Sequence, residues 1–172
     1  YSGNIGYTHN VETIIDIAAR LQNELEIHFM IIGNGGKKAD LIKSVETRGL
    51  TNCTFLDWLP ADKIVYSLSA ANLSVVTLTD DTAFVSVPSK TYNILSVGSP
   101  MLCVAPEKSE VGQLVKKEQC GKCYDKSHIK EMVNFILQLK SDKEYYAEMV
   151  QNSLNASMHY TFANASEYVC YK

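Results

Sequence analysis

The stretch Ile27-His28-Phe29-Met30-Ile31-Ile32-Gly33-Asn34-Gly35-Gly36 (residues 27–36) decides the fold class. A short, largely apolar run leads directly into a glycine-rich turn, and residues 38–48 then have the spacing of a helix that ends at Gly49. A strand that is apolar on both faces and is followed by a helix is typical of a parallel sheet with helices on both sides.

The same unit recurs along the chain about six times. Further strands are predicted at residues 1–5, 53–56, 73–78, 101–104 and 120–124, and further helices at 11–21, 60–71, 89–97, 110–118, 129–137, 142–158 and 162–171. We therefore expect residues 1–172 to form a single α/β domain, a Rossmann-like doubly wound parallel sheet of about six strands with helices on both faces. Such sheets bind ligands beyond the carboxyl ends of their strands.

Composition excludes several classes of protein. With 46% hydrophobic and 20% charged residues the chain has the profile of a globular protein, and its formal net charge of −3 argues against nucleic acid as a partner. No apolar run reaches the roughly 18 residues of a transmembrane segment, and no signal peptide is visible. Because the chain starts inside a predicted strand and without methionine, we expect a fragment of a longer polypeptide.

The five cysteines, at positions 53, 103, 120, 123 and 170, are odd in number, and three lie in apolar, strand-like runs. Free thiols in a reducing compartment explain this pattern better than disulfide bonds. Cys120 and Cys123 form a CxxC pair, but a zinc ribbon needs a second pair and a redox CxxC should open a helix. We therefore expect no metal site.

The glycine cluster that begins at Gly33 matches neither common nucleotide-binding loop. A dinucleotide fingerprint requires glycine where Lys38 stands and normally follows the first strand, and a phosphate loop requires Gly-Lys-Ser/Thr. Gly33 and Asn34 still lie at a strand end, where glycine lets a ligand approach the backbone. A simple tight turn explains them equally well.

A second strand-end feature is Val87-Pro88-Ser89-Lys90. Pro88 fixes the entry to a predicted helix and Ser89 is the expected N-cap, so the first-turn amides point at the edge where ligands bind. Such amides stabilise an anion, and the ammonium of Lys90 adds a full positive charge. Together they could hold a diphosphate without a metal; a capped helix with a solvated lysine is the alternative.

Three further candidates lie just past predicted strands. Trp58, the single tryptophan of the chain, follows the strand at 53–56 and either covers a base or closes the core. His9 lies in the loop after the first strand. Glu110 opens a helix, where carboxylates are common in any case.

Taken in order, these loops resemble the C-terminal domain of family 4 (group 1) glycosyltransferases, enzymes with two facing Rossmann-like domains, the GT-B fold. The most specific match is Pro-Ser-Lys-Thr-Tyr-Asn-Ile-Leu-Ser-Val-Gly-Ser-Pro at residues 88–100, which is similar to the donor-site helix of the family and the turn after it. Residues 1–6, 31–35, 52–60 and 118–121 resemble four other family segments in the same order.

The resemblance implies that the parent enzyme transfers a sugar, with retention of configuration, from a UDP- or GDP-sugar to a glycan or lipid-linked acceptor, without a metal or other cofactor. The acceptor would bind the absent N-terminal domain. The parent is expected in the cytoplasm, and its peripheral association with the inner membrane is left open. Lys90 would stabilise the leaving phosphate, and the expected donor-binding residues are Gly3, Asn4, Gly6, His9, Gly33, Asn34, Trp58, Leu59, Pro88, Ser89, Lys90, Asn93 and Glu110.

The sequence departs from the usual family pattern at four positions. The two donor-site glutamates fall on Val85 and Asn93, and the arginine and lysine of the first loop fall on Asn4 and His9. These departures resemble fucosyl- and N-acetylfucosaminyl-transferases of bacterial surface polysaccharide biosynthesis, that is, of capsule or lipopolysaccharide. Asn93 can still hydrogen-bond a ribose hydroxyl, but without charge.

Two other classes of function stay open at this point. An NAD-dependent oxidoreductase domain is one, although the fingerprint glycines and a correctly spaced acidic residue are missing. A non-catalytic docking or regulatory module is the other, because Val85 and Asn93 replace the acidic residues of the donor site.

Overall fold

The computed structural model describes residues 1–85 and 87–161, and the helix predicted at 162–171 lies outside them. Five strands are described: β1 (Phe29–Ile32), β2 (Cys53–Leu56), β3 (Ser74–Thr77), β4 (Met101–Val104) and β5 (Gly121–Tyr124). The helices are α1 (Glu12–Arg20), α2 (Lys38–Thr47), the 3₁₀ turn η1 (Ala61–Lys63), α3 (Ile64–Ser69), α4 (Lys90–Ser96), α5 (Glu110–Glu118), α6 (Ile129–Ser141) and α7 (Lys143–Ser157).

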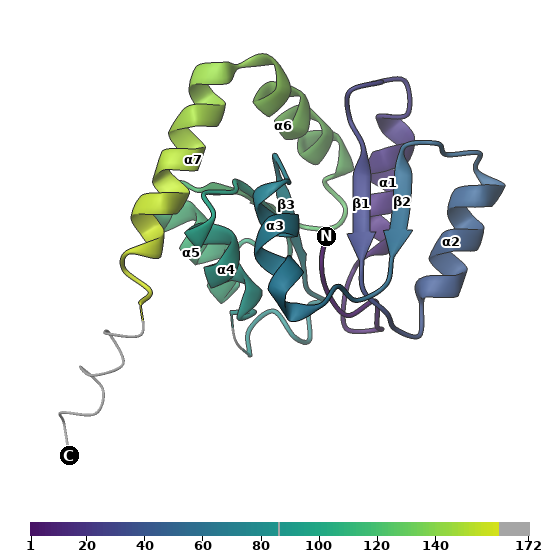
Figure 1. Cartoon of the computed structure of the whole chain (residues 1–172), viewed down its shortest axis with the longest axis horizontal. Helices are drawn as coiled ribbons and strands as arrows, with labels where there is room; N and C mark the ends of the chain where they lie inside the picture. The colour runs from purple at the N-terminus through teal and green to yellow at the C-terminus, as the bar shows by residue number, and fades with distance from the viewer. Residues whose placement is uncertain (86, 162–172) are drawn as a thin grey trace.

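All strand pairs are parallel, as predicted, but the strands form two groups. β1 pairs with β2, and β3, β4 and β5 pair in that order. Figure 1 shows the two groups with the N-terminus of the chain between β1 and β3. The groups are joined there by the loop of residues 7–10, because the Asn10 side chain donates to the Leu78 carbonyl at 2.8 Å.

The prediction of a strand at residues 1–5 was wrong. Only Ser2 forms a β-bridge, to Ile32, so the described sheet has five strands rather than about six. The segment runs beside the last residues of β1 and the turn after it: the Gly3 amide donates to the Ile32 carbonyl at 2.9 Å and the Ile5 amide to the Asn34 carbonyl, past the end of β1, at 3.0 Å. A short ladder of this kind has no signature in local sequence.

β4 separates the two hydrophobic cores, since its four residues are all buried and point alternately to opposite faces. Leu102 and Val104 pack into a core with α1, α2 and α6, whereas Met101 and Cys103 pack into a second core with α4 and α5. The helices therefore cover both faces of the parallel strands. This arrangement confirms the predicted Rossmann-like, doubly wound fold.

Two predicted helix starts differ from the structure. The helix predicted from Pro60 begins with η1 and continues as α3, and Pro60 itself is extended, with φ −54° and ψ 148°. Ser89 precedes α4 but its side chain makes no capping hydrogen bond, because its backbone is already helical (φ −55°, ψ −29°). Ser109, which is extended, does cap α5 by accepting from the Gly112 amide at 3.2 Å.

The cysteines in the described residues are free, as predicted. Burial raises the pKa of Cys120 to about 12 and the pKa of Cys123 to about 11. Both thiols therefore stay protonated and unreactive at neutral pH. Cys170 lies outside the described residues. No described helix is long and apolar enough to cross a membrane.

Candidate functional site

The loops after the strands meet at the carboxyl edge, and two of them touch through glycines. Gly33 has φ 139°, and a Cβ atom there would collide with the Gly3 carbonyl oxygen. Gly35 has φ 159°, and a Cβ atom there would likewise collide with the Ile5 carbonyl oxygen. These glycines therefore let the first loop of the protein pack on the turn after β1, which is a role distinct from the approach of a ligand.

Lys38 fixes the turn after β1 to the turn after β2, a function that sequence reasoning missed. Its ammonium donates to the Asp57 carboxylate at 2.7 Å, the Asn34 side chain at 3.0 Å and the Leu56 carbonyl at 3.1 Å. The same ammonium lowers the pKa of Asp57 by hydrogen bonding and by its charge. Asn34, an expected contact of the base, and Asp57, which precedes the expected contact Trp58, are thus held by one side chain.

Lys90 connects three segments that are far apart in the sequence. Its ammonium donates to the Ser2 carbonyl at 2.7 Å and lies over the ring of Trp58, 4.9 Å from the ring centroid. Trp58 is half exposed, so it does not close the core. Burial lowers the pKa of Lys90. The predicted cation and the predicted aromatic residue therefore lie in direct contact at the mouth of the site.

The first turn of α4 presents its amides beside Lys90. The amides of Thr91 and Tyr92 donate to the carbonyls of Pro88 and Ser89, at 2.9 and 3.2 Å. Within residues 1–85 and 87–161, no backbone partner is found for the amides of Ser89 and Lys90. Asn93 follows Lys90 by three residues on the same helix and is exposed.

His9 is held by the end of β3. Its Nδ1 lies 3.0 Å from the Thr77 carbonyl, which can only accept, so Nδ1 carries the proton. In the neutral ring Nε2 is then an acceptor. The loop around His9 is consequently fixed to the second group of strands.

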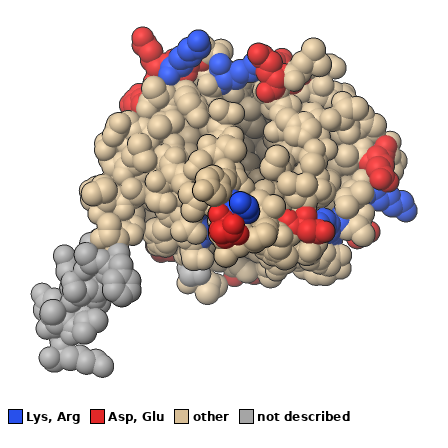
Figure 2. Space-filling view, viewed as in Figure 1, with Lys and Arg blue, Asp and Glu red and all other residues tan. Residues whose placement is uncertain are grey.

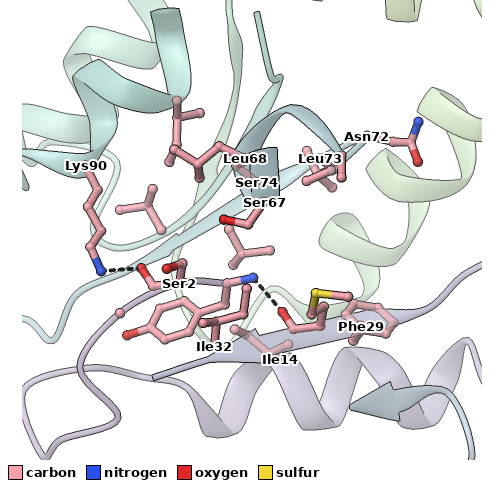
Figure 3. A pocket seen from close by; sticks show the side chains of 18 of the residues that line it. Ser2, Ile14, Phe29, Ile32, Ser67, Leu68, Asn72, Leu73, Ser74 and Lys90 are labelled. Atoms are coloured by element: carbon pink, nitrogen blue, oxygen red, sulfur yellow. Dashed lines mark hydrogen bonds between the residues drawn. The ribbon is translucent and has the colours of Figure 1, made fainter. Parts of the chain in front are cut away.

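A cavity of about 940 Å³ opens beside these residues and runs between β1 and β3. Figure 2 shows a hollow in this face whose visible walls are mostly uncharged, with charged side chains at its ends, and Figure 3 shows Lys90 bonded to Ser2 at one end. The expected site residues that line this cavity are Gly3, Asn4, His9, Trp58, Pro88, Ser89 and Lys90.

The other expected residues do not line the cavity; they are Gly6, Gly33, Asn34, Leu59, Asn93 and Glu110. Gly33 and Asn34 belong to the glycine turn next to it, and Glu110 is exposed at the first position of α5, after β4. Within the described part of the chain, no group of three or more histidine, cysteine, aspartate or glutamate side chains could hold a metal ion.

Comparison with known proteins defines the family. The model of group 1 glycosyl transferases matches residues 1–156. The chain therefore belongs to the group 1 glycosyl transferase family.

The relatives include WcaI of Escherichia coli K12, which is named as a colanic acid biosynthesis glycosyl transferase. It is 39% identical over 114 residues, which are 66% of this chain and 28% of WcaI. The catalytic domain of cholesterol-α-glucosyltransferase from Helicobacter pylori has a TM-score of 0.78 and 16% identity, with 94% of this chain and 96% of that domain covered. HepE from Anabaena, in complex with UDP and glucose, has a TM-score of 0.76 and 17% identity, with 98% of this chain and 47% of HepE covered. At these identities the two likenesses show the fold of the chain alone.

Proposed function

We propose that the chain is the nucleotide-sugar donor-binding domain of a retaining glycosyltransferase of bacterial surface polysaccharide biosynthesis. The family is that of the group 1 glycosyl transferases. The chain spans about 28% of the length of WcaI, so the activity proposed is that of the longer enzyme.

The observation that carries the proposal is the environment of Lys90. Its ammonium lies where the first loop, the turn after β2 and the start of α4 converge. A nucleoside diphosphate at this point would replace the Ser2 carbonyl as its partner. A hydrogen bond between charged groups contributes about 1.5–3 kcal/mol, which is more than a neutral carbonyl provides.

The remaining residues would surround the donor in a fixed order. The first loop, with Gly3, Asn4 and Gly6, would lie against the phosphates, and His9 would offer Nε2 or, when protonated, a second donor. The turn at Gly33 and Asn34 and the pair Trp58 and Leu59 would flank the base. Asn93 would bind the ribose, and Glu110 would reach the hydroxyls of the sugar.

The chemistry would need positive charge at the leaving group. In the transfer, the bond from the anomeric carbon to the β-phosphate oxygen breaks and a bond to the acceptor oxygen forms, while the acceptor proton passes to the diphosphate or to solvent. Negative charge therefore grows on the diphosphate in the transition state. The Lys90 ammonium and the Ser89 and Lys90 amides would stabilise that charge without a metal.

The donor and acceptor are proposed from similarity alone. WcaI is named for colanic acid, a bacterial polysaccharide, and HepE is described with UDP and glucose. We propose a UDP- or GDP-sugar of the fucose or N-acetylfucosamine type as donor, from the departures at Val85 and Asn93, and a glycan or lipid-linked acceptor bound by another domain. The parent enzyme would act in the cytoplasm, with a peripheral association with the inner membrane.

The test is a titration of the chain with UDP, GDP and NADH in separate experiments, followed by amide NMR. We expect shifts with UDP or GDP that are concentrated in residues 3–9, 33–37, 57–60 and 87–93, and no shift with NADH. The nucleotide that responds names the base.

Shifts with NADH alone would contradict the proposal and favour the oxidoreductase function. No response to UDP or GDP at millimolar concentrations would contradict the assigned site residues and favour a docking role.

A further inference from the structure

The turns after β1 and β2 lie side by side at the carboxyl edge of the strands (Figure 1). The Gly33 amide donates to the last carbonyl of β2 at 3.0 Å, and a Cβ atom at Gly33 would lie 3.4 Å from the Trp58 ring. Two polar side chains, Asn34 from the first turn and Asp57 from the second, meet there through Lys38. Both residues are exposed, so a ligand that rests against Trp58 can reach them.

Lys38 holds the Asp57 carboxylate in one orientation. An ammonium has three N–H donors, and the acceptors found for Lys38, on Asn34, Leu56 and Asp57, use all three. Only 15% of the Lys38 side chain is exposed, compared with 81% of the Asp57 side chain. A largely buried lysine thus supports a carboxylate that is open to solvent.

The charge of that carboxylate is also secured. The hydrogen bond from Lys38, the charge of Lys38 and a hydrogen bond from Asn34 together outweigh desolvation and lower the pKa of Asp57. Asp57 is therefore ionised at neutral pH, and an ionised carboxylate accepts hydrogen bonds and donates none. A ligand that pairs with it must present N–H or O–H groups.

The bases of nucleoside diphosphates differ in the groups that they present. Guanine has two adjacent donors on one edge, N1–H and the N2 amino group, which match the two oxygens of a carboxylate. Uracil has a single donor, N3–H, between two carbonyl oxygens, so one of these would face a carboxylate oxygen. Adenine has an unprotonated ring nitrogen beside its amino group, with the same conflict. Of these three bases, guanine alone can make two hydrogen bonds to Asp57 with this edge.

Trp58 adds a preference for a purine. Its ring is half exposed and lines the cavity, whereas Asp57, the residue before it, stands outside the lining. A base that stacks on the exposed part of the ring can extend its edge to Asp57. The two rings of a purine also cover more of the indole than the single ring of a pyrimidine, and stacking on an aromatic side chain strengthens with that overlap.

We propose that Asp57 selects guanine, and that the donor of the parent enzyme is therefore a GDP-sugar. The carboxylate would accept from N1–H and from the N2 amino group of the base, while Lys38, as a positioning residue, holds the carboxylate in place. This inference rests on the proposed function, because it names the base that the proposed donor site binds. It gives Asp57 a role that is separate from the binding of the diphosphate by Lys90.

The experiment compares four nucleotides that share a diphosphate. The dissociation constants of GDP, IDP, UDP and ADP are measured by NMR titration of the original chain, of Asp57→Asn and of Asp62→Asn. IDP keeps the N1–H group of guanine and lacks the amino group. Asp62→Asn is the matched control, because Asp62 is an exposed carboxylate in the neighbouring turn η1 and pairs with Lys63 at 3.5 Å.

We expect GDP to bind about 10- to 100-fold more tightly than UDP or ADP, with IDP between them. Asp57→Asn should bind GDP and UDP with similar affinity, because an amide offers the two guanine donors a single acceptor atom. Asp62→Asn should keep the preference of the original chain.

Lys38→Met tests the positioning role. It should lower the ratio of the GDP affinity to the UDP affinity, whereas a general loss of folded protein would weaken the binding of both nucleotides equally. An unchanged ratio would overturn the role of Lys38.

The outcomes separate this inference from the proposed function. A chain that binds UDP or ADP as tightly as GDP would overturn the inference and leave the proposed donor site standing. A preference for GDP that persists in Asp57→Asn would overturn the role of Asp57. If none of the four nucleotides binds at millimolar concentrations, the proposed function fails, and this inference fails with it.

Discussion

Lys90 is the residue on which the candidate site depends most. Lys90→Ala removes the charge opposite the proposed diphosphate, and we expect the affinity for UDP or GDP to fall about 10- to 100-fold. The NMR titration measures it. Lys130→Ala, the same change on the exposed side of α6, is the control and should bind as the original chain does. An unchanged affinity in Lys90→Ala would remove Lys90 from the site.

The amine of Tyr1 makes stability depend on pH. Burial, and to a smaller extent the charge of Lys90, lower its pKa from 8.0 to about 6 in the folded chain. Between pH 6 and 8 the unfolded chain therefore binds more protons, so stability rises with pH by about 2 kcal/mol. Urea unfolding between pH 5.5 and 8.5 tests this slope.

Acetylation of Tyr1 is the matched control for that slope. An acetylated amine keeps an N–H for the Met30 carbonyl but cannot gain a proton. The acetylated chain should lose this part of the pH dependence. If the free energy of unfolding changed equally with pH in the acetylated and unacetylated chains, the buried Tyr1 amine would not be the group responsible.

At the scale of single elements, we expect a Gly→Ala substitution in α5 to lower stability, although the same substitution usually stabilises a helix. Gly→Ala in a helix normally stabilises by about 0.5–1 kcal/mol. A Cβ atom at Gly112, however, would lie 2.5 Å from the Glu107 carbonyl oxygen, which belongs to the turn that enters the helix. We expect Gly112→Ala to destabilise the chain by about 1–3 kcal/mol, measured by urea unfolding.

Gly36→Ala is the control for this effect. Its new Cβ atom would meet only the ring of Tyr7, at 3.1 Å, and that ring is exposed and can move. Its stability should change by less than about 0.5 kcal/mol. If Gly112→Ala were as stable as the original chain, the backbone of the entering turn would have to be more adaptable than the structure indicates.

Sequence predicted those elements best whose signals are local. The strands expected at 53–56 and 101–104 agree with β2 and β4 at both ends, because short apolar runs there are bounded by polar residues and prolines. The strand expected at residues 1–5 was wrong, since its extent depends on pairing with Ile32 and not on its own pattern.

The candidate site follows the same division: its local signals were predictable and its long-range contacts were not. The start of α4 was found through Pro88 and Lys90, which are local signals. The contact of Lys90 with Ser2 and the triple hydrogen bond of Lys38 join residues that are far apart in the chain, so no spacing predicts them. The one sequence signal for the role of Lys38 was its position at the start of a helix, four residues after Asn34.

At the scale of the whole molecule, we expect the chain to bind nucleotide weakly and to transfer no sugar by itself. It spans about 28% of the length of WcaI, and the proposed acceptor site would lie on another domain. Incubation with UDP- and GDP-sugars and analysis of the products by mass spectrometry tests this. A glycosylated product formed by this chain alone would place the acceptor site within residues 1–172.

The position of Lys90 over Trp58 gives the protein an optical probe. Because Trp58 is the single tryptophan, the tryptophan fluorescence of the chain, excited selectively beyond the absorption of tyrosine, reports one place, the ring 4.9 Å from the Lys90 ammonium. A cation near an indole changes its emission, so any ligand that draws the ammonium away from the ring alters the signal without a label. Occupancy of this edge of the sheet can therefore be followed in a cuvette, at protein concentrations far below those that NMR requires.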